Sequence, residues 1–110
     1  MAEILRGKGC QVDGPFYKRV RPPGGRVMLS HVDLFGVFDL ISWGSFFMSD
    51  YGLTMHQVTA INMKSKKFKK IKEKRLDGYL WCRTDDRSKW EFRVFQIQKR
   101  SIKELGRLLG

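Results

Sequence analysis

The chain has 110 residues, with 22 Lys and Arg against 11 Asp and Glu, so that its formal net charge is +11. This length suits one domain, and a hydrophobic fraction of 42% argues against disorder. Nucleic acid is the partner that best explains the charge, because counterions released from phosphates drive basic proteins onto polyanions. We see no apolar run of the roughly 18 residues that cross a bilayer, and no N-terminal signal. We therefore expect a cytoplasmic protein with no membrane partner.

The first quarter of the chain predicts a short helix followed by extended segments. The helix is expected over residues 2–7, and Gly7 and Gly9 are expected to end it. Residues 10–21 are expected to be extended, with a turn at Gly14 and Pro15. Residues 22–26 (PPGGR) are predicted to form a turn or loop, because proline and glycine dominate them.

Two strands are predicted next, over residues 37–43 and 53–60. The first is rich in β-branched and aromatic residues and is bounded by Gly36 and Gly44. The second follows a turn around residues 49–52. We expect the two strands to pair as a hairpin.

A basic helix is predicted over residues 62–76, with Asn62 as its N-terminal cap. Phe68, Ile71 and Leu76 form a narrow apolar stripe along it. The positive charges are Lys64, Lys66, Lys67, Lys69, Lys70, Lys72, Lys74 and Arg75, beside the single acid Glu73. Such a run is either a solvated face or a phosphate-binding surface, and its excess of one sign favours phosphate.

The last part of the chain predicts two more strands, over 79–84 and 90–97, joined by a hairpin turn at 85–88. A final short helix is expected over 101–109. The order of these elements predicts one α/β domain over residues 1–110, with a single sheet.

An aspartate inside the apolar strand 37–43 needs an explanation, because a buried and unpaired carboxylate is costly. Asp39 either pairs with one of the many cations or binds a metal ion. Strand alternation places Gln57 and Thr59 on one face of the neighbouring strand. These side chains, together with Asp33, are the candidates for a site.

Two segments carry a family resemblance: HVDLFGVFDLISW at 31–43 and HQVTAIN at 56–62. Together they resemble the PD-(D/E)XK nuclease superfamily, most closely a small phage or archaeal-virus branch and the Holliday-junction-resolvase-like members. In that superfamily an aspartate on one core strand precedes an acid-x-lysine motif on the next. Asp39 matches the aspartate, Gln57 matches the acid, and a basic helix follows. The resemblance covers residues 31–76 well and the two late strands loosely.

The resemblance implies a restriction-endonuclease-like fold, a central mixed β-sheet flanked by helices. The implied activity is a metal-dependent DNA endonuclease that hydrolyses phosphodiester bonds, with branched (junction) DNA as one candidate substrate. Asp39 would bind Mg²⁺ or Mn²⁺, together with the Gln57 side-chain oxygen, the Val58 carbonyl oxygen and Asp33. Glu3 would correspond to a glutamate that members often place in a first helix.

The resemblance also implies a homodimer. If the protein is viral, the expected location is the host cytoplasm. DNA is expected to bind the basic helix, at Lys64, Lys66, Lys67, Lys70 and Arg75.

Thr59 departs from the superfamily pattern, because it stands where a lysine is usual. A threonine carries no positive charge with which to polarise water. Three outcomes stay open: Lys64 or Lys66 reaches back to the site, Thr59 only orients a water, or activity is lost and the fold only binds nucleic acid. A basic face that binds an acidic protein is a further function to consider.

Two histidines stand beside these motifs. Strand alternation turns His56 away from Gln57, so we expect a packing or surface role for it. His31 adjoins the first motif and is a candidate for contact with substrate.

Overall fold

The computed structural model describes residues 1–46, 52–84 and 91–109. Its helices are α1 (Ala2–Gly7) and α2 (Lys64–Glu73), and the turn η1 (Ile61–Met63) precedes α2. The strands are, in chain order, β1 (Gln11–Asp13), β2 (Phe16–Val20), β3 (Met28–Val32), β4 (Leu40–Gly44), β5 (Gly52–Ala60), β6 (Gly78–Arg83), β7 (Glu91–Gln98) and β8 (Ser101–Leu109).

Six of these strands form one mixed sheet, in the order β1–β4–β5–β6–β7–β8. All neighbours pair antiparallel except β5 and β6, which are parallel. A parallel pair needs a crossover connection, and α2 provides it. The expectation of one small α/β domain with a central mixed sheet is confirmed, and so is the hairpin pairing of β4 with β5.

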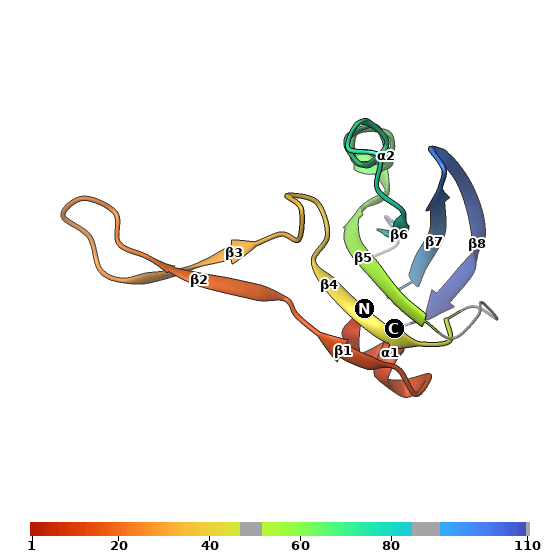
Figure 1. Cartoon of the computed structure of the whole chain (residues 1–110), viewed down its shortest axis with the longest axis horizontal. Coiled ribbons are helices and arrows are strands. Elements are labelled where there is room, and N and C mark those ends of the chain that lie inside the picture. The colour runs from red at the N-terminus through yellow and green to blue at the C-terminus, as the bar shows by residue number, and fades with distance from the viewer. Residues whose placement is uncertain (47–51, 85–90, 110) are drawn as a thin grey trace.

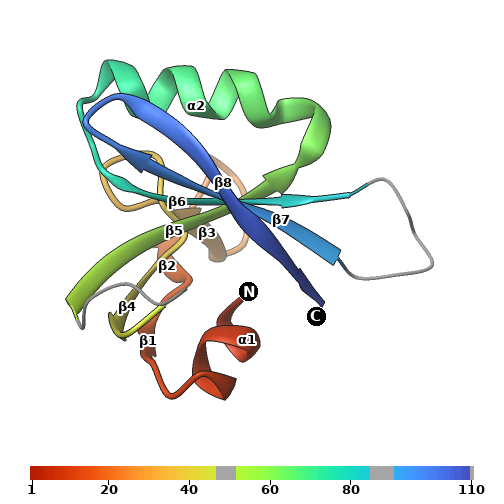
Figure 2. The ribbon, with the colours of Figure 1, turned by 90° about the vertical axis from the view of Figure 1, so that its right-hand side faces the viewer.

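The two helices cover opposite faces of this sheet (Figure 2). Side chains alternate along β6, so that Tyr79 and Trp81 belong to a core cluster with Leu5 of α1. Leu80 and Cys82 belong to a second cluster with Ile71 of α2. Phe68 also packs against that second cluster, which confirms the part of the apolar stripe that lies on the helix. Leu76 packs there too, but α2 ends at Glu73 and not at residue 76 as expected, so Leu76 lies beyond the helix.

The strands β2 and β3 form a separate two-stranded sheet that projects from the body as an arm (Figure 1). Their pairing runs from Phe16 opposite Val32 to Val20 opposite Met28, and residues 21–27 close the tip. The arm contributes to a longest dimension of 48 Å, against 33 and 30 Å in the other directions. The strand β3 was not foreseen from the sequence.

The helix expected over 101–109 is wrong, because this segment is the strand β8. Lys99 and Arg100 join it to β7 in a tight turn and have positive φ angles of 50° and 65°. The register shifts between Val94 and Phe95, whose partners are Gly106 and Glu104. Leu105 is therefore an extra residue in β8. The apolar residues Ile102, Leu105 and Leu108 have a three-residue spacing that resembles a helix, and the bulge lets a strand accommodate it.

Two further boundaries differ from the sequence predictions. The strand expected over 37–43 begins only at Leu40, because residues 33–38 form a turn in which the N–H groups of Val37 and Phe38 donate to the Leu34 carbonyl. The α2 N-cap is Met63, without a side-chain hydrogen bond, so Asn62 is not the cap. The turn expected at 85–88 lies outside the described residues.

A buried polar network surrounds His56, whose ring is fully inaccessible. The Trp81 indole N–H donates to Nδ1 at 3.1 Å. An indole nitrogen only donates, so the proton of the neutral ring sits on Nε2, within 2.8 Å of the Ser42 and Thr54 hydroxyls. The ring also stacks on Tyr79. His56 is therefore a packing residue, as expected, and burial lowers its pKa to about 3.

This network predicts a loss of stability in acid. When the chain unfolds, His56 regains its ordinary pKa of 6.5, so the unfolded state takes up the proton first as the pH falls. The free energy of unfolding should therefore fall between pH 6.5 and 4, by at most about 1.4 kcal/mol per pH unit from this group. Urea unfolding at several pH values measures it. His56→Gln should remove this component and His31→Gln should keep it; equal slopes in all three proteins would contradict the prediction.

Candidate functional site

The candidate site lies where the arm joins the main sheet, and Asp39 anchors it. The N–H of Asp39 donates to the His56 carbonyl at 2.8 Å. The N–H of Val58 donates to the Asp39 carboxylate, also at 2.8 Å. These two bonds lie on either side of Gln57 in the sequence, so they hold Asp39 against the middle of β5.

Three possible metal ligands converge at this point. His31 lies on β3, Asp33 follows that strand, and Asp39 precedes β4. The imidazole Nδ1 of His31 is 3.2 Å from an Asp33 carboxylate oxygen, and its Nε2 is 3.6 Å from one of Asp39. One ligand atom from each residue lies within 4.8 Å of the others. The turn over 33–38 brings the two carboxylates together.

The surroundings of Asp39 disfavour its negative charge. Burial raises the pKa of this carboxyl, the hydrogen bond from Val58 opposes that effect, and the nearby charge of Asp33 raises the pKa further. A cation between the two carboxylates would reverse this balance.

A pocket of about 360 Å³ opens beside Asp39. Its lining comes from the first residues of the chain, the arm and its base, the start of β4 and the strand β5: Met1, Ala2, Pro15, Tyr17, His31, Asp39, Leu40 and Val58. The pocket therefore gives a ligand access to two of the three candidate metal-binding residues.

The donor set fits a divalent cation. Two carboxylates supply hard oxygen ligands, and the imidazole adds a nitrogen. Mg²⁺ prefers a shell of oxygens, whereas a first-row transition ion accepts nitrogen more readily. Of the two expected ions, Mn²⁺ is the better match to His31, Asp33 and Asp39.

The side chain of Gln57 takes a different direction. Gln57 is the register partner of Leu80, so it lies on the α2 side of the sheet, and it is only 4% exposed. It does not line the Asp39 pocket. Its Oε1 is buried and accepts no hydrogen bond within the described residues. The structure thus brings Asp39 to the backbone of the residues on either side of Gln57. The buried Gln57 amide oxygen has no hydrogen-bond partner among the described residues.

The remaining predicted site residues are dispersed. Val58 meets Asp39 through its N–H, and its side chain lines the pocket. Thr59 is buried on the α2 side as the register partner of Cys82. The ammonium of Lys64 lies over the Phe95 ring, 4.8 Å from its centroid, on that same side. Glu3 is exposed on α1, whose neighbouring residue Ala2 lines the pocket.

The cations predicted to bind DNA belong to α2 and the residues after it. Lys66, Lys70 and Arg75 are exposed, while Lys64 and Lys67 are half-buried. After α2, the Lys74 ammonium donates to the Phe35 carbonyl at 2.7 Å. This contact joins the residue after the basic helix to the turn that connects Asp33 with Asp39.

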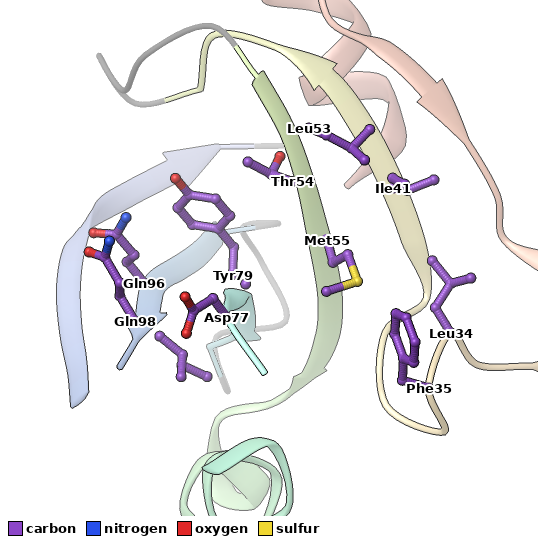
Figure 3. A pocket seen from close by; sticks show the side chains of 12 residues that line it. Leu34, Phe35, Ile41, Leu53, Thr54, Met55, Asp77, Tyr79, Gln96 and Gln98 are labelled. Atoms are coloured by element: carbon purple, nitrogen blue, oxygen red, sulfur yellow. The ribbon is translucent and has the colours of Figure 1, made fainter. Parts of the chain in front are cut away.

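A second pocket, of about 540 Å³, has a different character (Figure 3). Leu34, Phe35, Leu53 and Met55 contribute to its largely apolar lining. Among the described residues that line it, Asp77 is the one charged side chain, and its carboxylate accepts the Lys99 N–H at 3.0 Å. This pocket offers no group of metal ligands, so the chemistry is better sought at Asp39.

His31 is the site residue that sequence reasoning undervalued. The signal was present in the spacing His31-x-Asp33, since residues two apart leave an extended chain on the same side. It was weak because nothing in the sequence identified 28–32 as a strand whose end meets Asp39.

Comparisons of the chain with protein-family models, with curated proteins and with solved structures gave no match. Within the described residues, none of the helices has the length and apolar character needed to cross a membrane.

The cluster predicts binding of Mn²⁺. Asp39→Asn and Asp33→Asn should each weaken binding by at least about tenfold, because each removes a charged ligand. Electron paramagnetic resonance of free Mn²⁺ in a titration measures this affinity. Glu73→Gln, which changes one exposed carboxylate on α2, is the control and should have no effect. Equal affinities in all four proteins would show that the metal does not bind at this cluster.

Proposed function

We propose that this protein is a metal-dependent DNA endonuclease. The observation that carries the proposal is the convergence of His31, Asp33 and Asp39 at a pocket on a strongly basic protein. Mn²⁺ or Mg²⁺ held there would supply an activated water and neutralise charge on the phosphate under attack. The restriction-endonuclease-like fold and the homodimer implied by the sequence resemblance are part of the proposal.

The arrangement of elements supports this function. The aspartate precedes one strand, the neighbouring strand carries Gln57, and the basic helix α2 follows directly. The sheet is mixed and has helices on both faces, as the resemblance implies. Val58 lines the Asp39 pocket and Gln57 lies on the opposite face of β5, so the proposal assigns the ligand role to His31, Asp33 and Asp39 and not to the Gln57 side chain.

The chain's own residues would act mainly by positioning. The Val58 N–H fixes one oxygen of the Asp39 carboxylate and leaves the other facing His31. Thr59 and Lys64 do not line the pocket, which leaves no lysine among the described residues that form it. Stabilisation of the transition-state charge would then fall to the metal and to cations outside the pocket.

Cleavage of DNA tests this proposal directly. Supercoiled plasmid and a four-way junction, each with Mn²⁺ or Mg²⁺, should be nicked by the wild-type protein. Asp39→Asn should reduce the rate by at least about 100-fold, since it removes a charged metal ligand. Glu73→Gln is the control; it removes no metal ligand and makes α2 more basic, so it should retain at least the wild-type activity. Cleavage that survives Asp39→Asn unchanged would refute the assignment.

The basic helix gives an independent prediction. Replacement of Lys66, Lys67 and Lys70 by Ala should lower DNA affinity and reduce its salt dependence by about one unit of slope per lost phosphate contact. Anisotropy titrations over a range of salt concentrations measure both. Lys103→Ala on β8, an exposed change at the sheet edge remote from β4, should leave the slope unaltered. An unchanged slope in the triple variant would mean that α2 does not face DNA.

A non-catalytic nucleic-acid-binding module is the second candidate. Thr59 at the lysine position favours it, and so does the absence of a lysine from the described lining of the Asp39 pocket. It would bind DNA tightly and in a salt-sensitive manner, without nicking in either metal. An acidic protein partner is a third reading, which predicts that DNA does not compete for the basic face.

A further inference from the structure

The β2–β3 arm has no role in the site beyond the residues at its base. Both strands belong to a sheet of their own, and the arm stands away from the body (Figure 1). An isolated two-stranded ribbon is only marginally stable in water. A ribbon that projects in this way can contact another molecule along its length.

The charge of the arm indicates what that molecule is. Lys18, Arg19, Arg21 and Arg26 lie within residues 14–32, a stretch that contains no acidic residue. None of the four makes an ion pair with another described residue. Four uncompensated cations on a narrow ribbon attract a polyanion and repel a second arm.

The arm also exposes apolar side chains. Tyr17, Val27, Met28 and Leu29 are between 57% and 69% exposed. Base edges and sugars in a DNA groove offer apolar contacts, and the major groove, about 12 Å wide, admits a two-stranded β-ribbon. Cations combined with apolar groups on one ribbon thus match a duplex groove.

The strand register connects one face of the arm to the Asp39 pocket. Tyr17 is paired with His31, and both line that pocket. The pair two residues farther out, Arg19 and Leu29, lies on the same face because side chains alternate. Lys18, paired with Ser30, lies on the opposite face. Arg19 is therefore the first cation met on leaving the pocket along this surface.

We propose that the arm lies in the major groove of duplex DNA, with the face of Tyr17, His31, Arg19 and Leu29 against the nucleic acid. Arg19 binds a backbone phosphate beside the pocket, since a guanidinium can grip a phosphate with two parallel hydrogen bonds. Leu29 contacts the groove. This inference rests on the proposed function in taking DNA as the ligand, and it assigns the duplex to a surface that the α2 prediction does not include.

Neighbouring residues of one strand provide the test. Arg19→Gln and Lys18→Gln each remove one positive charge, but from opposite faces of the arm. Affinity for a fluorescein-labelled 20-bp duplex is measured by anisotropy in EDTA, so that no metal-dependent cleavage occurs. Arg19→Gln should weaken binding about tenfold, and Lys18→Gln less than about threefold. Equal effects would reduce the arm to a general charge contribution and overturn the proposal.

A second variant keeps the test independent of single side chains. Replacement of residues 21–27 by Asn-Gly shortens the arm with a two-residue hairpin turn and removes its tip. Duplex affinity should fall at least about tenfold while the melting temperature stays constant, because the tip projects beyond the core. Unchanged affinity would also overturn the proposal. A Leu29→Asp variant gives a further test. If this change converts a dimer into a monomer but leaves duplex affinity at the wild-type value, the arm contacts a second copy and the proposal is overturned.

Plasmid nicking by the same proteins separates this inference from the nuclease proposal. If the wild-type protein nicks DNA and Arg19→Gln binds duplex as tightly as the wild type, the arm inference falls and the nuclease proposal stands. If binding depends on Arg19 but no metal supports nicking, the arm inference stands and the nuclease proposal falls. Absence of any duplex binding by the wild type would overturn the arm inference.

Discussion

The attachment of Asp39 to β5 is the contact on which the site depends. Its main-chain N–H reaches the His56 carbonyl, and its carboxylate receives the Val58 N–H. These bonds end the turn over 33–38 and set the start of β4. Because the same turn follows β3, they also fix where the arm leaves the body. A single aspartate thus aligns a strand, a turn and the root of the arm.

The strand β5 is polar on both of its faces, although it lies inside the sheet. His56 faces the α1 side, and Gln57 and Thr59 face the α2 side; all three are buried. His56 has its hydrogen-bond partners in Trp81, Ser42 and Thr54. The Gln57 amide oxygen has none within the described residues. The polar side chain on the α1 side of β5 therefore has its hydrogen-bond partners, whereas the Gln57 amide oxygen on the α2 side accepts no hydrogen bond from the described residues.

The sequence was sufficient for the elements whose signals are local. Periodicity identified α2 through Phe68 and Ile71, and residue type identified β5, β6 and β7. The sequence prediction failed at 101–109, where the apolar residues have the spacing of a helix. A bulge at Leu105 accommodates that spacing in a strand, and only pairing with β7 decides the structure. For Asp39, alternation assumed a strand where the chain makes a turn, so the carboxylate met Val58 and His31 and not the Gln57 side chain. Such contacts depend on tertiary structure, which local pattern does not encode.

The division of the three donors between two parts of the molecule has a mechanical consequence. Asp39 is fastened to the main sheet, while His31 belongs to β3 and Asp33 follows directly from it. Two of the three donors, His31 and Asp33, therefore lie at the base of the arm. A change in the orientation of the arm relative to the main sheet would therefore change the distances from His31 and Asp33 to the Asp39 carboxylate. The distances within the cluster then depend on the orientation of the arm as well as on the main sheet.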